Sequence, residues 1–307
     1  MRARFLGTAV SAVLSITAVV LMIKPGLNYG IDFVGGTLVE VRTEQPARLD
    51  ALRGGLSNLG LGEIALQEAG STKQVLLRIE RQPGDDKAQV NATDRIRTAL
   101  AEIAPGSSIE RVEVVGPKVS GELMEAGILA VVLAAVSMLI YIWIRFEWQF
   151  AVGAIVTLVL DVTKAAGLFA ITGMDFNLTA IAALLTLIGY SVNDKVVVYD
   201  RMRENLRLYK KMPLRELIDI SINATLARSL YTSATALLSV LPMALVGGTA
   251  VDNFAIAMVF GIVVGASSSV FIAAPILLFL GEGRLRPAPP INSGRPAGRP
   301  QADGLVS

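Results

Sequence analysis

The sequence predicts an α-helical polytopic membrane protein, with six transmembrane helices and one ferredoxin-like α+β domain between the first helix and the second. Two observations lead to this prediction. Apolar residues make up 53% of the 307 residues and the mean hydropathy is +0.57, whereas soluble domains average about 45–50% apolar residues with glycine included. In addition, six apolar runs are long enough to enter a bilayer, and one long mixed segment separates the first run from the rest.

A spanning helix needs about 20 predominantly apolar residues. The first apolar run, 5–23, follows two arginines and ends at Lys24 and Pro25. A basic start before an apolar run also describes a signal peptide. This run is long for a signal and further runs follow it, so we expect an uncleaved helix. The later runs are 123–144, 150–171, 178–199, 230–246 and 254–280, and Pro242 and Pro275 can kink the last two.

The mixed segment has the residue patterns of a small folded domain. Alternating apolar and polar residues predict strands, and leucine or isoleucine at helical spacing predicts helices. Their order, β-α-β-β-α-β, is that of a ferredoxin-like domain. The expected strands lie at 39–42, 64–68, 74–80 and 111–114, and the expected helices at 49–59 and 96–103.

The chain is therefore expected to have four parts. Residues 1–24 form the first transmembrane helix, and residues 25–120 form the α+β domain. Residues 121–280 form a five-helix membrane domain that contains a cytoplasmic loop at 200–229. The last part, 281–307, is rich in Pro, Gly, Ala and Arg, which is typical of a disordered tail.

Basic residues are distributed unevenly among the connecting segments. Loops 173–177 and 247–253 contain no Lys or Arg, whereas the 200–229 loop is strongly basic, and arginines also precede the first span and follow the last. Cytoplasmic segments of membrane proteins carry an excess of Lys and Arg. We therefore expect both termini in the cytoplasm and the 25–120 domain on the outer side of the membrane, in the periplasm if the cell has two membranes.

The composition excludes several functional classes. The chain contains no histidine and no cysteine, so the usual zinc ligands and the usual base of a Ser-His hydrolase are missing. A net charge of only +2 gives no global basic field for nucleic acid. We expect a protein that is not an enzyme and that uses no cofactor and no metal. Any proton relay must use Asp, Glu, Lys, Arg, Tyr or water.

Asn193, Asp194 and Lys195 interrupt the apolar run of the fourth span. A carboxylate at bilayer depth costs about 2.5–3.5 kcal/mol on insertion scales, so Asp194 is expected either to move an ion or to pair with a cation. The natural counter-charge is Arg228, at the start of the fifth span. Proton coupling through this pair and a static salt bridge between helices both remain open. Lys195 is expected to snorkel towards the cytoplasmic headgroups.

A second charged pair occurs in the third span. Asp161 and Lys164 are three residues apart, close enough on one helical face to pair with each other. A self-neutralised pair and a functional role for Asp161 are both consistent with this spacing. Two rows of small residues should face protein rather than lipid, because they allow helices to approach closely. These rows are Gly153, Thr157, Asp161 and Ala165 in the third span, and Ala257, Gly261, Gly265 and Ser269 in the sixth.

Two other stretches are expected to have structural rather than chemical roles. The glycine-rich segment 30–37 lacks the Lys-Ser/Thr of a phosphate loop and leads into a strand, so it is expected to shape the passage from membrane to domain. Apolar residues at helical spacing after Pro213 predict an amphipathic helix in the 200–229 loop. We expect that helix to lie along the inner membrane face.

Taken together, these residues resemble the SecD/SecF family of the bacterial Sec protein-export system, within the resistance-nodulation-division superfamily. Order and spacing make the resemblance specific, and it covers nearly everything before the tail. The motifs that carry it are Gly30-Ile31-Asp32-Phe33 with Gly35-Gly36-Thr37, Val115-Gly116-Pro117, Tyr141-Ile142-Trp143-Ile144-Arg145-Phe146, Gly189-Tyr190-Ser191-Val192-Asn193-Asp194, Val196-Val197-Val198-Tyr199-Asp200-Arg201, Arg228 and the stretch 261–269.

The resemblance implies a function in protein export. It implies a subunit that pairs its six helices with six of SecD and uses the proton-motive force to promote export after ATP-driven translocation. The partners it implies are SecD, the SecY-SecE-SecG channel, YajC, YidC, unfolded preproteins and membrane lipids. It places proton coupling on Asp194 and Arg228, with Asn193 and Asp161 beside them.

The chain departs from the family pattern at two positions. Leu160 stands where members usually carry histidine, and Lys195 where they usually carry a small polar residue. Two other functions are compatible with the sequence. One is half of a proton-driven exporter of lipids or small hydrophobic solutes, and the other is a passive assembly scaffold whose intramembrane charges only hold subunits together.

Overall fold

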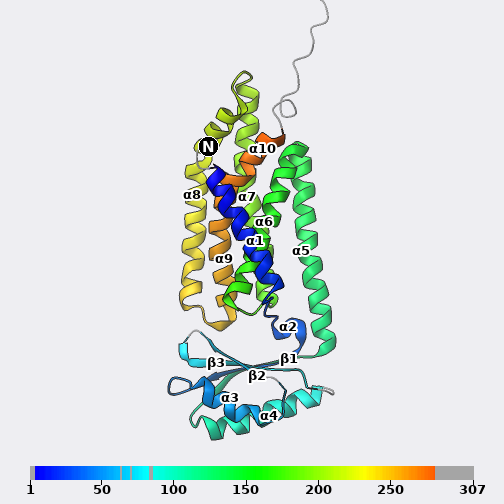
Figure 1. The fold of residues 1–307 in the computed structure, drawn as a ribbon, viewed down its shortest axis with the longest axis vertical. Helices are drawn as coiled ribbons and strands as arrows, with labels where there is room; N and C mark the ends of the chain where they lie inside the picture. Colours follow the sequence, from blue (N-terminus) through cyan, green and yellow to red (C-terminus); the bar gives the residue numbers. More distant parts are fainter. Residues whose placement is uncertain (1–3, 63, 70, 83–85, 281–307) are drawn as a thin grey trace, which may run out of the picture.

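The computed structural model describes residues 4–62, 64–69, 71–82 and 86–280. A long helical bundle carries a small sheet domain at one end (Figure 1). The elements are α1 (Arg4–Ile23), α2 (Ile31–Val34), β1 (Gly36–Arg42), α3 (Leu49–Ser57), β2 (Ile64–Ala69), β3 (Ser71–Ile79), α4 (Asp86–Ile103), β4 (Ser108–Val115), α5 (Pro117–Arg145), α6 (Trp148–Thr172), α7 (Leu178–Leu208), α8 (Leu214–Val246), α9 (Thr249–Ser268), the π-helical turn η1 (Ser269–Ala273) and α10 (Ala274–Leu280).

Six helical segments of the described chain are long and apolar enough to cross a membrane, as predicted. Helices α1 and α5–α8 account for five, and the sixth joins α9, η1 and α10 into one run, Val251–Leu278. The N-terminal end of α1 and the end of α10 lie at the end of the bundle opposite the sheet domain (Figure 1). The predicted tail, 281–307, lies outside the described residues.

The sheet domain has the predicted β-α-β-β-α-β order. Its four strands pair in the order β2-β3-β1-β4, and every pairing is antiparallel. Both α3 and α4 cover the face of the sheet that points away from the bundle (Figure 1). Val39, Leu77, Leu56 and Ile96 are among the fully buried residues of the core between sheet and helices. The ferredoxin-like class is therefore confirmed.

The sheet domain is attached to the bundle through the loop that joins α6 to α7. The backbone N–H of Gly30 donates to Phe176 O at 2.9 Å, and Phe176 N–H donates to Asn28 O at 2.7 Å. Arg78 of β3 donates to Asn28 Oδ1 at 2.7 Å, and the Asn28 amide donates to Asp175 Oδ1 at 2.6 Å. The domain thus contacts the residues immediately before α7.

The glycine-rich segment leads into β1, as predicted, and positive φ explains two of its glycines. Gly35 and Gly36 have φ of 75° and 122°, values that side-chain-bearing residues rarely adopt. A Cβ on Gly36 would also lie 2.5 Å from Ile79 O of the neighbouring strand. The turn from α2 into the sheet therefore requires glycine at this point.

The predicted 200–229 loop is largely helical, which corrects two expectations. The fourth span continues as α7 to Leu208, and the predicted amphipathic helix is the first part of α8. No Gly or Pro occurs between Leu214 and Leu241, so nothing in the sequence ends the helix before the fifth span. Leu214, Ile218 and Ile222 pack in one core cluster with Tyr199 and Met202 of α7. The apolar face therefore packs against α7 and not along the membrane surface.

The hairpin formed by α7 and α8 is pinned by two side-chain hydrogen bonds. Asn205 Nδ2 donates to Ser221 Oγ at 2.8 Å near the loop, and Tyr190 Oη donates to Ser233 Oγ at 2.9 Å further along. These bonds fix the register of the two antiparallel helices. The tip of the hairpin projects beyond the rest of the bundle at the end opposite the sheet (Figure 1).

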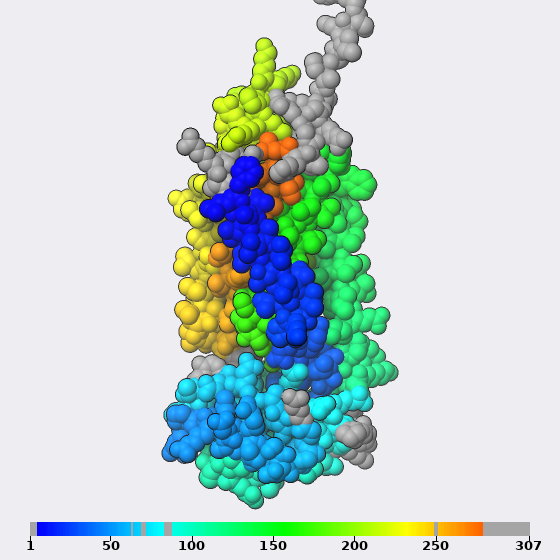
Figure 2. Space-filling view, in the orientation of Figure 1, coloured from blue at the N-terminus to red at the C-terminus, as the bar shows by residue number. Residues whose placement is uncertain are grey.

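Small residues allow the close helix packing that the sequence predicts. A Cβ on Gly261 of α9 would lie 2.0 Å from Leu187 Cδ1 of α7, and one on Gly167 of α6 would lie 2.3 Å from Ala18 Cβ of α1. Helix α1 crosses the face of the bundle obliquely (Figure 2). The centre of the bundle is formed by α6, α7 and α9, and this is where the buried charges lie.

Candidate functional site

Asp161 lies near the middle of α6, and its side chain is fully enclosed. The helix presents it on the predicted small-residue row, and Gly153, Thr157 and Ala165 of that row are all buried. Thr157 donates back to Gly153 O at 2.9 Å, which satisfies its hydroxyl within the helix. The row therefore faces protein, and Asp161 points from it towards α7 and α9.

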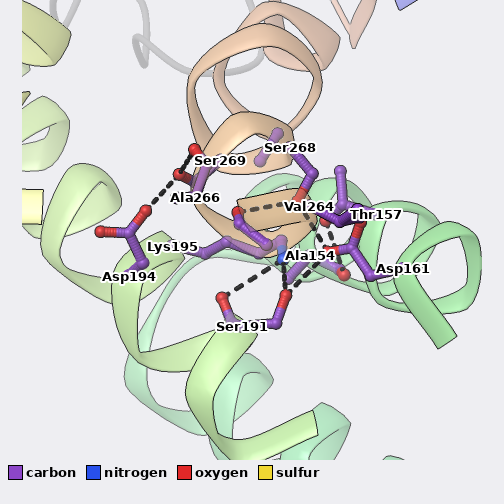
Figure 3. A network of polar contacts seen from close by, with 12 residues as sticks. Ala154, Thr157, Asp161, Ser191, Asp194, Lys195, Val264, Ala266, Ser268 and Ser269 are labelled. Carbon is purple, nitrogen blue, oxygen red and sulfur yellow. Dashed lines mark hydrogen bonds and ion pairs between the residues drawn. The ribbon is translucent and has the colours of Figure 1, made fainter. Parts of the chain in front are cut away.

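The Asp161 carboxylate accepts hydrogen bonds from three helices (Figure 3). Oδ1 accepts from Lys164 Nζ at 3.2 Å. Oδ2 accepts from Ser191 Oγ at 2.7 Å, from Lys195 Nζ at 2.9 Å and from Ser268 Oγ at 2.6 Å. An ionised carboxylate only accepts and has about four lone-pair sites. The surrounding donors therefore suit an ionised Asp161.

Lys195 does not extend to the membrane surface, which corrects the predicted snorkelling. Its side chain is fully buried, and its ammonium lies against Asp161 and Ser191. One helical turn separates Ser191 from Lys195, so Nζ reaches the Ser191 carbonyl at 3.2 Å and also its hydroxyl. An inward-facing anion within reach is the physical reason, because a buried ammonium needs a counter-charge.

Lys164 ties the same carboxylate to the first helix. Its Nζ lies 3.2 Å from Asp161 Oδ1, so the predicted pair three residues apart is confirmed. The same ammonium donates to Ser11 Oγ of α1 at 2.9 Å. Lys164 therefore has a protein partner on each side, and it joins α1 to the charge cluster.

Asp194 is buried next to Lys195 but has a different environment. It is 6% exposed, and its Oδ2 accepts a hydrogen bond from Ser269 Oγ. Ser268 and Ser269 are consecutive at the junction of α9 with η1, yet they donate to different carboxylates, Asp161 and Asp194 (Figure 3). The start of the π-helical turn thus contacts both buried acids.

Arg228 does not form the predicted ion pair with Asp194. Arg228 is exposed on α8, and within the described part of the chain no Lys or Arg lies in ion-pair distance of Asp194. The hairpin register places Arg228 at about the level of Asp194 along the helices, but on the outer surface. Asn193 is exposed as well. The structure therefore brings Asp161 and Asp194 into the bundle and leaves Asn193 and Arg228 on its surface.

Sequence reasoning missed most of the residues that hold the site together. Ser11, Ser268 and the inward position of Lys195 were not predicted, and neither was the hydrogen bond from Ser191 to Asp161. One usable signal was present, since Ser191 and Lys195 are four residues apart and share a helical face. No cluster of acidic residues, histidine or cysteine that could hold a metal ion occurs among the described residues.

Fold and site together define a multi-pass helical membrane protein, with ionisable residues enclosed in its bundle and a folded domain at one end. A family model described as protein export membrane protein SecD/SecF, C-terminal, matches residues 95–283, and a SecD/SecF GG motif model matches residues 20–47. The chain belongs to the SecD/SecF family of protein export membrane proteins. It is accordingly a multi-pass protein of the inner membrane.

Curated relatives support the same assignment over most of the chain. The protein translocase subunit SecF of Rhodobacter capsulatus is 43% identical over 286 residues, covering 89% of this chain and 85% of the relative. The protein translocase subunit SecF of Rickettsia bellii is 43% identical over 268 residues, covering 87% of this chain and 88% of the relative.

Solved structures extend the likeness to the fold. The crystal structure of SecDF from Thermus thermophilus, a translocon-associated membrane protein, matches with a TM-score of 0.83 at 33% identity. A SecDF structure described as the super-membrane-facing form matches with a TM-score of 0.65 at the same identity. Each match covers 91% of this chain but only 38% of the longer SecDF chain.

Proposed function

We propose that this chain is a subunit of the accessory complex of the Sec preprotein translocase, which uses the proton-motive force to promote protein export after ATP-driven translocation. It acts as a moving part of a transport machine and carries out no enzymatic reaction. The relatives named protein translocase subunit SecF support the system. The observation that supports a proton-driven role is Asp194, a carboxylate held at bilayer depth with a single described hydrogen-bond donor.

Protonation of Asp194 changes what it can offer to the neighbouring helix. As a carboxylate it accepts from Ser269, whereas as a carboxylic acid it also carries a donor. Ser269 begins the π-helical turn, an irregular segment of the last span. Such turns occur often at functional sites. A change at Asp194 therefore acts first on the α9–η1 junction, and Arg228 acts from the surface rather than as a buried partner.

The energy available is sufficient for a modest conformational change. One charge that crosses a potential of about 100 mV releases roughly 2.3 kcal/mol. That is enough to reverse a small preference between two packings of the helices. The sheet domain contacts the loop directly before α7, so a shift of α7 reaches the domain. The two SecDF structures, matched at TM-scores of 0.83 and 0.65, support the view that relatives differ in shape.

Exposed polar residues in the bundle support one of the proposed partners, SecD. Asn193 and Arg228 are exposed at the depth of the spans, and such residues usually face protein or water rather than lipid. The SecDF chain is much longer than this one, which supports SecD as the partner that covers them. The remaining partners that we propose are the SecY-SecE-SecG channel, YajC, YidC, unfolded preproteins and membrane lipids.

Both termini lie in the cytoplasm and the sheet domain in the periplasm, as the distribution of basic residues indicates.

Replacement of Asp194 tests this function. In membrane vesicles that carry the assembled export complex, Asp194→Asn is expected to abolish proton-dependent export while assembly is retained. Asp200→Asn is the matched control, because Asp200 lies on the same helix but is exposed and pairs with Arg145 at 3.1 Å. Export by the Asp194→Asn variant at the wild-type rate would contradict proton coupling through Asp194. A passive assembly scaffold would also tolerate the Asp194→Asn substitution.

The exporter alternative is tested with the purified protein in liposomes. An exporter of lipids or small hydrophobic solutes would move such solutes against a gradient in liposomes that contain no translocase. We expect no such transport, because the described residues form only one small sheet domain at that end of the bundle. Solute transport in those liposomes would overturn the assignment to protein export.

A further inference from the structure

The buried charges of the bundle form a closed set. Among the described residues of α1 and α5–α10, the buried Asp, Glu, Lys and Arg side chains are Asp161, Lys164, Asp194 and Lys195. Two are anionic and two are cationic, so the enclosed net charge is zero when all four are ionised. An uncompensated charge in the interior costs several kcal/mol. Any proton taken up by this set must therefore be offset within it.

We propose that Lys195 is the proton-releasing partner of Asp194: when Asp194 takes up a proton, the Lys195 ammonium gives one up. The proposal rests on the proposed function and names a residue that acts with Asp194. Uptake converts the Asp194 carboxylate to the acid, and release converts the Lys195 ammonium to the neutral amine. Asp161 and Lys164 then remain as a neutral pair at 3.2 Å. The reverse exchange, with loss from Asp194 and uptake by Lys195, resets the cluster.

The contacts of Lys195 suit both of its protonation states. Its Nζ contacts Asp161 Oδ2, the Ser191 carbonyl and the Ser191 hydroxyl. A neutral amine keeps two N–H donors, for Asp161 and the carbonyl, and its lone pair can accept from the hydroxyl. Ser191 has one hydroxyl proton, so in this state it donates to the amine instead of to Asp161 Oδ2, which still accepts from Ser268 at 2.6 Å. The amine can therefore form without leaving a buried donor or acceptor unpaired.

Lys164 is the less suitable of the two lysines for this role. Its ammonium donates to Asp161 on one side and to Ser11 of α1 on the other. It is three residues from Asp161 on the same helix, so the pair persists when α6 and α7 shift against each other. Lys195 reaches Asp161 across the α6–α7 interface, so a shift of α7 changes its environment directly.

Among the described residues, the groups around Lys195 include no other titratable side chain that could replace it as the proton-releasing partner. From α6 it meets Asp161 and Lys164, and on α7 itself it feels the charge of Asp194. Helix α9 and η1 present the hydroxyls of Ser268 and Ser269. The remaining buried titratable side chain of α7 is Tyr199, which donates to Ala273 O at 3.3 Å. The nearest charged residue of α8 at this level, Arg228, is exposed.

Two arginine variants test the proposal in vesicles that carry the assembled complex. Arginine keeps the positive charge but does not lose its proton in proteins. Lys195→Arg is expected to reduce proton-driven export and proton flux at least tenfold. Lys118→Arg is the matched control, because Lys118 is exposed at the start of α5 and lies outside the buried set, and it is expected to stay within twofold of wild type. Wild-type flux in Lys195→Arg would overturn the proposal, since it would show that only the charge at 195 is needed.

A methionine variant decides the question if the arginine variant does not assemble. Methionine has no proton to release, so Lys195→Met is likewise expected to reduce proton-driven export and proton flux at least tenfold. Wild-type flux in Lys195→Met would overturn the proposal.

Thermal unfolding of the purified full chain tests the charge linkage separately. Asp194→Asn and Lys195→Met each leave one buried charge without its counterpart, and the double variant restores neutrality. The double variant is therefore expected to unfold at a higher temperature than the less stable single variant. If the decreases in unfolding temperature of the two single variants simply add in the double variant, the charges of residues 194 and 195 do not compensate each other. Wild-type export that is indifferent to the proton gradient would instead refute the proposed function itself.

Discussion

The ammonium of Lys195 lies 2.9 Å from the carboxylate of Asp161, and neither side chain is exposed. This pair joins α7 to α6 in the middle of the bundle. The same carboxylate also accepts from Lys164 and from Ser268 of α9. One acidic residue of α6 thus anchors the helix that carries Asp194 and the helix that ends in the π-helical turn.

Asp161→Asn is expected to destabilise the protein strongly. The substitution removes the anion that faces both buried lysines, and breaking a buried ion pair from one side costs about 3–5 kcal/mol. Unfolding of the purified protein in detergent, followed by circular dichroism against temperature or denaturant, measures the loss. Asp200→Asn serves as control, because its exposed pair with Arg145 is worth about 0–1 kcal/mol. Equal stability of the two variants would show that Asp161 does not hold the bundle together.

The two glycines of α9 are expected to respond differently to alanine. A Cβ on Gly261 would lie 2.0 Å from Leu187 Cδ1 and 3.1 Å from its Cγ. Leu187 is buried and cannot easily move away, so we expect Gly261→Ala to cost about 1–3 kcal/mol through overpacking. A Cβ on Gly265 would lie 3.5 Å from Ser191 Cβ, an ordinary contact. Gly265→Ala is therefore expected to be neutral or slightly stabilising, because alanine is the better helix former.

Thermal unfolding midpoints of the two alanine variants check this difference. The comparison is internally controlled, since both glycines lie on the same helix one turn apart and face α7. A Gly265→Ala variant that is as unstable as Gly261→Ala would mean that any side chain on this row disrupts the interface. Equal midpoints for Gly261→Ala and wild type would mean that α7 and α9 separate easily.

The spans could be predicted from the sequence, whereas their continuations could not. Hydropathy detects the part of a helix that lies in the bilayer, so the sequence predicts the runs 178–199 and 230–246. It does not detect that α7 continues to Leu208 and that α8 already begins at Leu214. Those extra turns are amphipathic and charged, and they are stabilised by packing against each other. Only the three-dimensional contact shows which surface their apolar face covers.

The side-chain contacts of the site were predictable from the sequence only where both residues of a pair lie on the same helix. Asp161 and Lys164 are three residues apart, so helical spacing alone predicts their pairing. Contact between Lys195 and Asp161 depends on how α7 is rotated against α6, which no local pattern specifies. The same reason explains the error at Arg228. The expected pairing with Asp194 required Arg228 to face α7, but the rotation of α8 leaves Arg228 exposed.

The contact between the sheet domain and the bundle is expected to depend on pH through Asp175. Burial raises the pKa of Asp175 above its usual 3.8, and the positive charge of Arg78, whose Nη1 lies 3.6 Å away, offsets only part of that rise. A raised value in the folded state means that the docked domain holds this proton more tightly than an undocked or unfolded one. Its contribution to stability is therefore complete below pH 3.8 and is lost as the pH rises through the raised value.

Asp175→Asn mimics the protonated state at every pH. The amide oxygen can still accept from Asn28 Nδ2, which donates to Asp175 at 2.6 Å. We expect the variant to be at least as stable as wild type at pH 7, and its stability to change less between pH 4 and pH 7. Thermal unfolding in detergent across that range measures both effects. If the carboxylate were instead held mainly by Arg78, the variant would be less stable than wild type at pH 7, and acid would weaken the wild-type contact.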